Sequence, residues 1–502
     1  MLHRRAFVTG ASALAMLGGI RASVGQGATG TRRSVRGMTA NDPDLAAYRR
    51  GVAAMKALPA SDPRNWTRFA AIHASFCPHG NWYFLPWHRA YLVALENIIR
   101  DLAAKPDFAL PYWDWSAERQ LPPAFGAGTR RNNPLNHARP KFSPGEALPD
   151  DMVGTQVLSR ILASPDFEAF GSARPRPEQR RRAMAAPLGV HGALGGDMAQ
   201  VGPASRDPIF YLHHANVDRL WAMWNARGNA NSPEAMWRNF TFNRNFINAD
   251  GQPWNVAVVN LQSPAALGYR YDDEDGPFAA DVDFSGAAAV ADDPLGHSLR
   301  AYRQLGDNAA PRSTGALHRV GLPAGGAFYV ASAENDHAAA HARAISIPVP
   351  LGRPLSEAIK GGPMAAASPM ERRRDRQYVM AVLRDVDAPT EPSTRVRMFV
   401  NREGVDINAR AADPHYVTTL SFFGAGHADH RAQHGGHHGQ HAAQPSTGGT
   451  SLAIDLTPAL SRLRGTKHFR TDKITVQLMP VCRYANSATS VMRPRRVEIA
   501  IL

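Results

Sequence analysis

The stretch that decides the fold is Asp207-Pro208-Ile209-Phe210-Tyr211-Leu212-His213-His214-Ala215-Asn216-Val217-Asp218-Arg219-Leu220-Trp221. Asp207 can cap a helix and Pro208 suits its first turn. From there, apolar residues and one histidine recur at helical spacing, which predicts a buried stripe of Phe210, His214, Val217 and Trp221. His213 lies beside this stripe. Asp218 follows His214 by one turn, where a carboxylate can orient a ligand imidazole or hold a neighbouring side chain.

A second stretch upstream, residues 72–89, carries three more histidines: His73, His79 and His88. His73 shares a predicted helical stripe with Phe69, Ile72 and Phe76. Pro86 suits the start of the next helix, on which one face collects Leu85, His88, Leu92, Leu95 and Ile99. Two histidines therefore project from the apolar faces of successive helices, with His79 in the loop between them.

These histidines favour a metal site. A neutral imidazole in an apolar wall needs a partner, because leaving it unsatisfied is costly. A single buried histidine usually finds a hydrogen bond, whereas three within sixteen residues indicate a shared ion. Imidazole suits Cu, Zn, Fe and Ni, so spacing alone leaves the ion open.

The two stretches resemble the paired copper motifs of the family of tyrosinases, catechol oxidases and mollusc haemocyanins. The matching pieces are FLPWHRAYL around His88 and DPIFYLHHANVDRLW, with the shorter pieces 111–115, 267–271 and 413–417. The resemblance runs from about residue 40 to the C-terminus and is greatest to bacterial polyphenol oxidases with a trailing β-domain. It implies two copper ions, O₂ as co-substrate and oxidation of phenols or catechols to o-quinones.

Carried over by position, the resemblance implies that His73, His79 and His88 bind the first copper and that His191 and His214 bind the second. Cys77 stands two residues before His79, where some family members form a Cys–His thioether. We therefore expect this bond, with an inert buried thiol as the alternative. His213 and Asp218 are the candidate catalytic residues beside the second copper.

The pattern breaks at the second copper. The family places a histidine four residues before the position of His191, on the same helix face, but this chain has Pro187 there, or Leu188 if one residue is skipped. Neither side chain can bind a metal. The second copper then keeps two histidines and water with weak or absent activity, or a distant group such as Glu178 or His137 substitutes, or the local reading frame is in error. The corresponding alternatives to an active oxidase are a pseudo-enzyme, an impaired single-copper homologue and a haemocyanin-like O₂ carrier.

The hydrophobic pattern and composition of the chain around these motifs predict an α+β multidomain fold. A mainly α-helical bundle holding the dicopper centre spans residues 40–272, and a Gly-, Ala- and Asp-rich connector spans 273–317. Residues 318–502 form a predicted C-terminal antiparallel β-sandwich, interrupted by a His-rich loop at 426–441. Its predicted strands are Ala327–Ala333, Ile345–Pro350, Gln377–Arg384, Arg395–Val400, Tyr416–Phe423, Ile474–Met479 and Val497–Leu502.

The N-terminus predicts export. Arg4 and Arg5 precede a mild apolar run, which is typical of a twin-arginine signal peptide over residues 1–28. The run is too short for stable membrane insertion. We therefore expect the twin-arginine export machinery as a partner and a periplasmic or extracellular location.

The charge balance adds little to function. The 502 residues carry a formal net charge of +14, but the short arginine clusters are far apart and accompany no nucleic-acid-binding module. We expect small phenolic substrates and no nucleic acid. The two cysteines, Cys77 and Cys482, allow at most one disulfide.

Overall fold

The structure is a computed structural model that describes residues 30–501. Left out of that range are residues 80, 141, 144, 163–166, 173–184, 275–316, 322–326, 362–378, 390, 392, 423–449 and 483–490. The predicted signal peptide, the His-rich loop, Glu178 and nearly all of the connector therefore lie outside the described residues.

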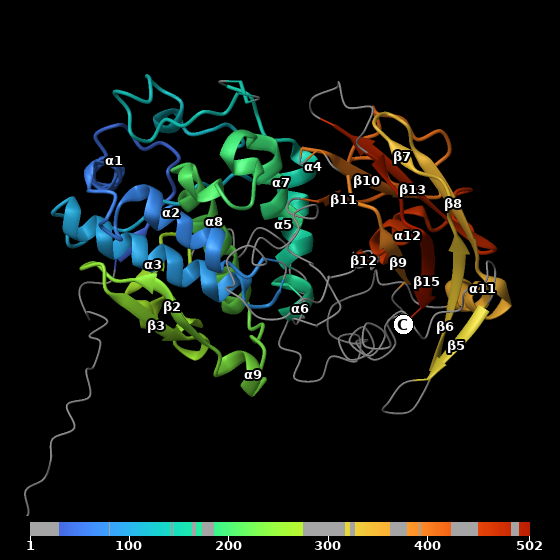
Figure 1. The fold of residues 1–502 in the computed structure, drawn as a ribbon. Coiled ribbons are helices and arrows are strands. Elements are labelled where there is room, and N and C mark those ends of the chain that lie inside the picture. The colour runs from blue at the N-terminus through green and yellow to red at the C-terminus, as the bar shows by residue number, and fades with distance from the viewer. Residues whose placement is uncertain are drawn as a thin grey trace, which may run out of the picture.

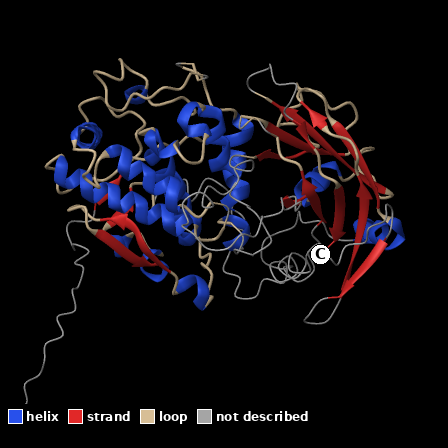
Figure 2. Cartoon of the chain, viewed as in Figure 1, coloured by secondary structure: helices blue, strands red, loops and turns tan. Residues whose placement is uncertain are grey.

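Helices make up the first half of the chain (Figures 1 and 2). Two long ones pack against each other at its centre, α3 (Phe84–Leu102) and α8 (Ile209–Ala226). The others are α1 (Pro43–Ala57), α2 (Trp66–Phe76), α4 (Asp150–Val153), α5 (Thr155–Leu162), α6 (Phe167–Phe170), α7 (Ala185–Leu194), α9 (Ala235–Arg238) and the short 3₁₀ turns η1 (Pro123–Phe125), η2 (Gly196–Ala199), η3 (Ala204–Arg206), η4 (Val258–Leu261) and η5 (Ala265–Leu267).

The starts of the helices follow from local sequence. The Asp42 side chain accepts the backbone N–H groups of Asp44 and Leu45 at the start of α1, and Asn65 accepts that of Thr67 at the start of α2. The predicted stripe on α3 is buried throughout. The stripe on α2 is partly wrong: His73 and Phe69 are buried, but Phe76 at the end of the helix is 39% exposed.

Two short sheets border the helices. In the first, β1 (Gly30–Arg32) runs parallel to β4 (Tyr269–Tyr271), and in the second, β2 (Thr241–Ile247) pairs antiparallel with β3 (Pro253–Ala257). The first pairing joins the two ends of the helical half. It also places β1 in that half, although the predicted boundary at residue 40 leaves it out.

The second half consists of antiparallel strands, as predicted, and its described residues form two large sheets and one short pair, β7 with β14. The four-stranded sheet has the order β11-β10-β13-β8 and the five-stranded sheet β12-β9-β15-β6-β5. Their apolar faces share one core, to which Val396 and Val476 contribute from the first sheet and Leu383 and Ile499 from the second. The structure thus confirms a chain of helices followed by antiparallel sheets.

The seven predicted strands correspond, with shifts of a few residues at their ends, to β6, β8, β9, β10, β11, β13 and β15 of the full set. The strands are β5 (Leu317–Gly321), β6 (Ala327–Glu334), β7 (Ala339–Ala340), β8 (Ile345–Pro350), β9 (Val379–Val386), β10 (Arg395–Val400), β11 (Tyr416–Ser421), β12 (Thr450–Asp455), β13 (Lys473–Val481), β14 (Val491–Met492) and β15 (Arg496–Ile501). The helices α11 (Gly352–Gly361) and α12 (Thr457–Leu463) accompany them.

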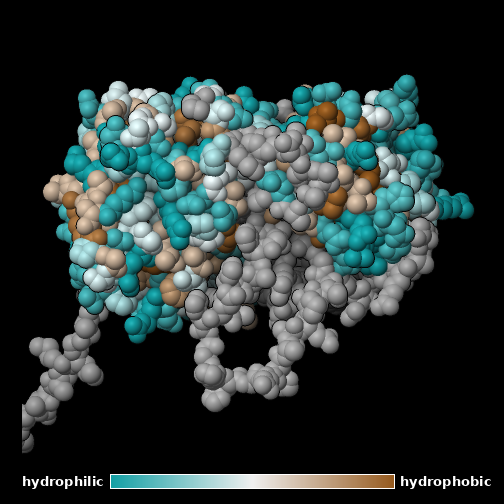
Figure 3. Space-filling view, turned by 45° about the horizontal axis from the view of Figure 1, so that its top comes forward, coloured by the Kyte–Doolittle hydropathy of each residue, from teal (hydrophilic) through white to brown (hydrophobic). Residues whose placement is uncertain are grey.

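Among the described residues, no helix is both long and apolar enough to cross a bilayer. The face shown in Figure 3 is mostly polar, with hydrophobic side chains in small separate patches between polar ones. Both cysteines are free thiols, Cys77 in the helical half and Cys482 buried in the β half, so the structure holds no bridge between them.

Candidate metal centre

The first group of histidines comes from α2, the following loop and α3. The Nε2 atoms of His73 and His79 lie 3.1 Å apart, and the ring centres of His73 and His88 are 5.7 Å apart. His79 donates from Nδ1 to the Cys77 carbonyl at 3.1 Å, and His88 donates from Nδ1 to the Phe84 carbonyl at 2.9 Å. Since a carbonyl only accepts, each of these two neutral rings keeps its Nε2 lone pair for a metal.

The second group comes from α7 and α8. The Nε2 atoms of His191 and His214 lie 3.2 Å apart. His191 donates from Nδ1 to the Met198 carbonyl at 2.9 Å, which again leaves Nε2 as the atom that can bind a metal.

The two groups meet in one pocket. The rings of His88 and His214 are stacked, with centres 3.9 Å apart and planes only 4° from parallel. Phe210 packs against both groups, with its ring centre 4.8 Å from that of His73 and 4.3 Å from that of His214. The five histidines that the sequence singled out therefore converge, which the helical spacing predicted for His73, His88 and His214 and the family resemblance implied for His79 and His191.

Burial keeps these imidazoles neutral. It lowers the pKa of His73, His88 and His214 well below the ordinary value, and neighbouring histidines lower it further. Burial also lowers the pKa of His191 to about 4, although its hydrogen bond to Met198 opposes the shift. The unprotonated form is the one that binds metals, so the pocket holds its donors ready at neutral pH.

His213 is placed with the second group but has a different hydrogen bond. His191, His213 and His214 each present one possible ligand atom, and these atoms lie within 4.8 Å of one another. However, His213 Nδ1 accepts a hydrogen bond from the Trp115 indole N–H at 3.1 Å. Indole N–H only donates, so the proton of the neutral His213 ring is on Nε2. This Nε2 is buried and has no hydrogen-bond partner in the structure.

His213 therefore fits the role of a hydrogen-bond donor beside the second group better than that of a third ligand. To bind a metal through Nε2 it would have to move its proton to Nδ1, and two N–H groups would then face each other at the Trp115 contact. Sequence reasoning missed Trp115, although the segment 111–115 is one of the family-like pieces.

Cys77 lies at the edge of the first group. Its Sγ is 3.7 Å from His88 Nε2, and the set of possible ligands His73, Cys77 and His88 is as close together as the second group. Burial raises the pKa of the thiol, which favours its protonated form in the metal-free pocket.

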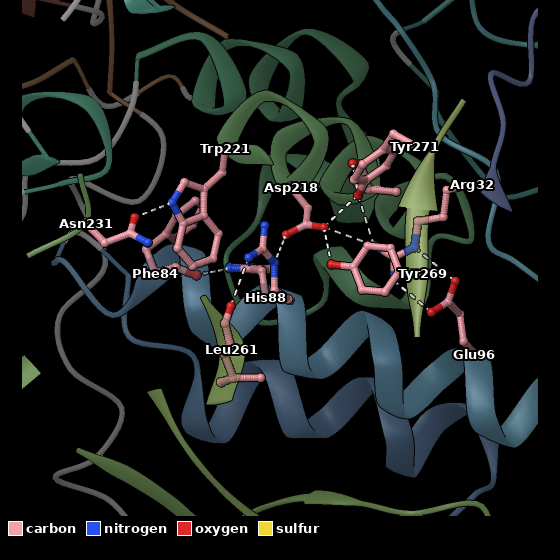
Figure 4. A network of polar contacts seen from close by, with 12 residues as sticks. Arg32, Phe84, His88, Glu96, Asp218, Trp221, Asn231, Leu261, Tyr269 and Tyr271 are labelled. Atoms are coloured by element: carbon pink, nitrogen blue, oxygen red, sulfur yellow. Dashed lines mark hydrogen bonds and ion pairs between the residues drawn. The ribbon is translucent and has the colours of Figure 1, made fainter. Parts of the chain in front are cut away.

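Among the described residues, the hydrogen-bond partners of Asp218 include no imidazole. Instead it accepts hydrogen bonds from Arg89 at 2.5 Å, Arg32 at 3.0 Å and both tyrosines of β4 at 2.6 Å (Figure 4). Burial disfavours the charged carboxylate, but Arg89 and Arg32 outweigh it and hold the pKa below the ordinary value. The sequence allowed Asp218 either to orient a ligand imidazole or to hold a neighbouring side chain. Its contacts fit the second role: Asp218 holds Arg89, the residue that follows His88 on α3.

The same network contains residues that were not selected from the sequence. Arg32 makes a two-point ion pair with Glu96 at 2.8 and 3.0 Å, and its guanidinium lies 3.7 Å from the ring centre of Tyr269. Arg32 lies before residue 40, where the predicted helical half begins. The family-like segment 267–271, which supplies both tyrosines, was the signal that could have pointed to this network.

The missing ligand position lies in the first turn of α7, where Pro187 fits because the backbone N–H there needs no helical partner. Of the proposed substitutes, His137 forms an ion-pair contact with Asp197 at 3.0 Å. His137 belongs to neither group of possible ligands found among the described residues.

Taken together, the donors fit copper. Imidazole rings are suitable ligands for copper. The first group offers three such rings and the second group two, with His213 beside them.

Comparison with known proteins supports the family. The common central domain of tyrosinase matches residues 63–147 and, in a second overlapping match, residues 126–227. A tyrosinase of Hahella sp. (strain CCB-MM4) is 26% identical over 88% of this chain and 93% of its own length. The (+)-larreatricin hydroxylase of Larrea tridentata is 31% identical, but the match covers 46% of this chain and about half of that protein, 47%.

Solved structures agree on the fold. The latent apple tyrosinase superposes over 95% of this chain and 97% of its own with a TM-score of 0.62 at 18% sequence identity, and a latent aurone synthase gives the same score. At this identity the likeness concerns the fold alone, and it extends over both halves. The matching domain, the relatives and the converging histidines place residues 63–227 in the tyrosinase family, and they indicate an oxidoreductase of the tyrosinase and polyphenol oxidase type.

Proposed function

We propose that this protein oxidises phenols or catechols to o-quinones with O₂ by means of two copper ions. His73, His79 and His88 hold the first copper in this proposal, and His191 and His214 hold the second. The stacking of His88 on His214 at 3.9 Å carries the proposal, because it brings the two groups close enough to share one O₂ molecule.

When bound, copper supplies the redox chemistry, since it cycles between Cu(I) and Cu(II). The residues of the chain supply the rest. Phe210 packs against His73 and His214. The Nδ1 hydrogen bonds of His79, His88 and His191 hold each ring in orientation. His213 offers its Nε2–H to an oxygen atom that enters beside the second copper. Asp218 positions α3 through Arg89 and thereby His88.

Oxidation of one catechol to an o-quinone releases two protons and two electrons, so two catechols reduce one O₂ to two water molecules. The proposal extends to a thioether between Cys77 and His79, in which an S–C bond replaces the S–H bond of the thiol and one C–H bond of the ring. The two electrons and two protons released would be taken up by O₂ at the bound copper, and intact-mass measurement would detect the loss of two hydrogens.

The alternative is an impaired homologue with one firmly bound copper. Pro187 favours it, because α7 then offers one imidazole where the family pattern has two. Two measurements on the purified protein distinguish the oxidase, the impaired homologue and an O₂ carrier. They are copper content by mass spectrometry, and oxygen uptake with a catechol and with a monophenol. Two coppers with catechol turnover support the oxidase; one copper without turnover supports the impaired homologue; two coppers without turnover match an O₂ carrier.

We also propose that residues 1–28 direct export through the twin-arginine machinery to the periplasm or beyond. The domain division 40–272, 273–317 and 318–502 is part of the same proposal. Replacing Arg4 and Arg5 with lysine and following the protein by cell fractionation tests it, since export by this route should then stop.

A further inference from the structure

The two halves of the molecule meet at helices α4 and α7, which face strands β10 and β11 (Figure 1). β11 contacts both helices. The strongest polar link is the ion pair between Arg397 on β10 and Asp151 on α4, both of whose side chains are buried. The Tyr416 hydroxyl at the start of β11 adds a long contact of 3.5 Å to the Asp151 carbonyl.

A second contact lies next to this ion pair and leads to the metal centre. Arg395 Nη1 lies 3.4 Å from the sulfur of Met152, and both residues are buried. The methyl end of Met152 packs on Gly189 of α7, so closely that a Cβ atom at position 189 would lie 2.6 Å from it. Gly189 precedes His191 by two residues on the same helix.

We propose that Asp151 and Met152, held by Arg397 and Arg395 of the β half, are positioning residues for His191 and thus for the second copper. The inference rests on the proposed function, because it assumes that His191 binds a metal. It extends that function by making one of the two metal positions dependent on the β half.

The first copper position has different support. Its histidines lie on α2, α3 and the loop between them, and these helices pack on α1, α8, β2, η3 and η4, all within the helical half. α7 instead packs between α4, α8, η2 and β11. Pro187 makes the second copper position depend still more on α7. With proline in place of the family's histidine, His191 is the one family-pattern ligand on this helix, so any shift of α7 moves that ligand directly.

The test uses the full-length protein and compares matched variants. Asp151→Asn keeps the shape of the side chain and removes the charge that pairs with Arg397. Asp413→Asn is the control: it breaks the less buried pair with Arg402, 2.7 Å long, that lies within the β half. Met152→Ala removes the contact with Gly189 without changing charge.

Copper binding is measured by titration of the metal-free protein with Cu(II) against a competing chelator. We expect Asp151→Asn and Met152→Ala to weaken the second equivalent about tenfold or more, the range found when a group that supports a metal ligand is removed. The first equivalent should be unchanged, and Asp413→Asn should change neither. An unchanged second equivalent in both variants overturns the inference, as does equal weakening of both equivalents.

Hydrogen exchange in the metal-free protein separates a failure of this inference from a failure of the proposed function. Faster exchange of the α7 amides in Asp151→Asn, with α2 and α3 unchanged, supports the positioning role even if the wild-type protein binds fewer than two coppers. Equal exchange of α7 in wild type and variant overturns it.

Discussion

At the scale of single residues, the hydrogen bond between Trp115 and His213 gives a direct prediction. In the metal-free protein, ¹⁵N NMR should show His213 with its proton on Nε2 and His88 and His191 with theirs on Nδ1, because their partners are an indole N–H and two carbonyls respectively. Trp115→Phe removes the donor, so His213 should shift toward the Nδ1–H form while the other two rings stay as they are. A wild-type His213 protonated on Nδ1 would contradict the assignment.

The pKa values of the same residues predict how acid affects the metal-free protein. Burial lowers the pKa of His191 to about 4, whereas an unfolded histidine titrates near 6.5. Below pH 6.5, His191 takes up a proton in the unfolded chain but stays neutral in the folded chain until the pH nears 4. The free energy of unfolding therefore falls between pH 6.5 and about 4. The slope is up to about 1.4 kcal/mol per pH unit for each such histidine.

Urea denaturation of the metal-free protein at pH 7, 6 and 5 measures this slope. His191→Asn should reduce the slope by about the contribution of one proton. A stability that stays flat from pH 7 to 5 would show that the buried rings accept protons in the folded state.

At the scale of elements, Asp218 joins β1, α3, α8 and β4 through buried charges. Asp218→Asn leaves Arg89 and Arg32 with less compensating charge in the interior, and removal of one partner from a buried pair costs about 3–5 kcal/mol. We expect a loss of unfolding free energy in this range. Asp62→Asn, whose partner Arg64 is about one-fifth exposed, serves as the control and should cost about 1 kcal/mol or less. Equal losses in the two variants would show that the network adds little.

Helix α7 offers a gain-of-function test of the missing ligand. Pro187→His places an imidazole four residues before His191, on the same helix face. We expect tighter binding of the second copper, about tenfold or more, and faster catechol oxidation. Ala186→His, five residues before His191 and off that face, is the matched control. If both variants bind copper like the wild type, α7 does not follow the family pattern at this turn.

At the scale of the whole molecule, the sequence predicted most of what depends on periodicity. The spacing of His73, His88 and His214 with apolar residues placed all three in one core, and alternation in the second half predicted seven strands. The predicted burial of Phe76 was wrong, because helical spacing does not show where the end of a helix leaves the core. His213 and Asp218 were found, but their partners were not: Trp115 and Arg32 lie 98 and 186 residues away, and no local pattern reports such contacts.

The parallel pairing of β1 with β4 has a consequence for how the chain is made. Arg32 leaves the ribosome among the first residues of the helical half, but the Tyr271 hydroxyl to which it donates follows 239 residues later. Contacts so distant in sequence form late, because a long loop must close before they can. During synthesis the nascent helical half therefore stays open at its N-terminal edge until residue 271 has emerged, and closure of that half is timed by translation itself.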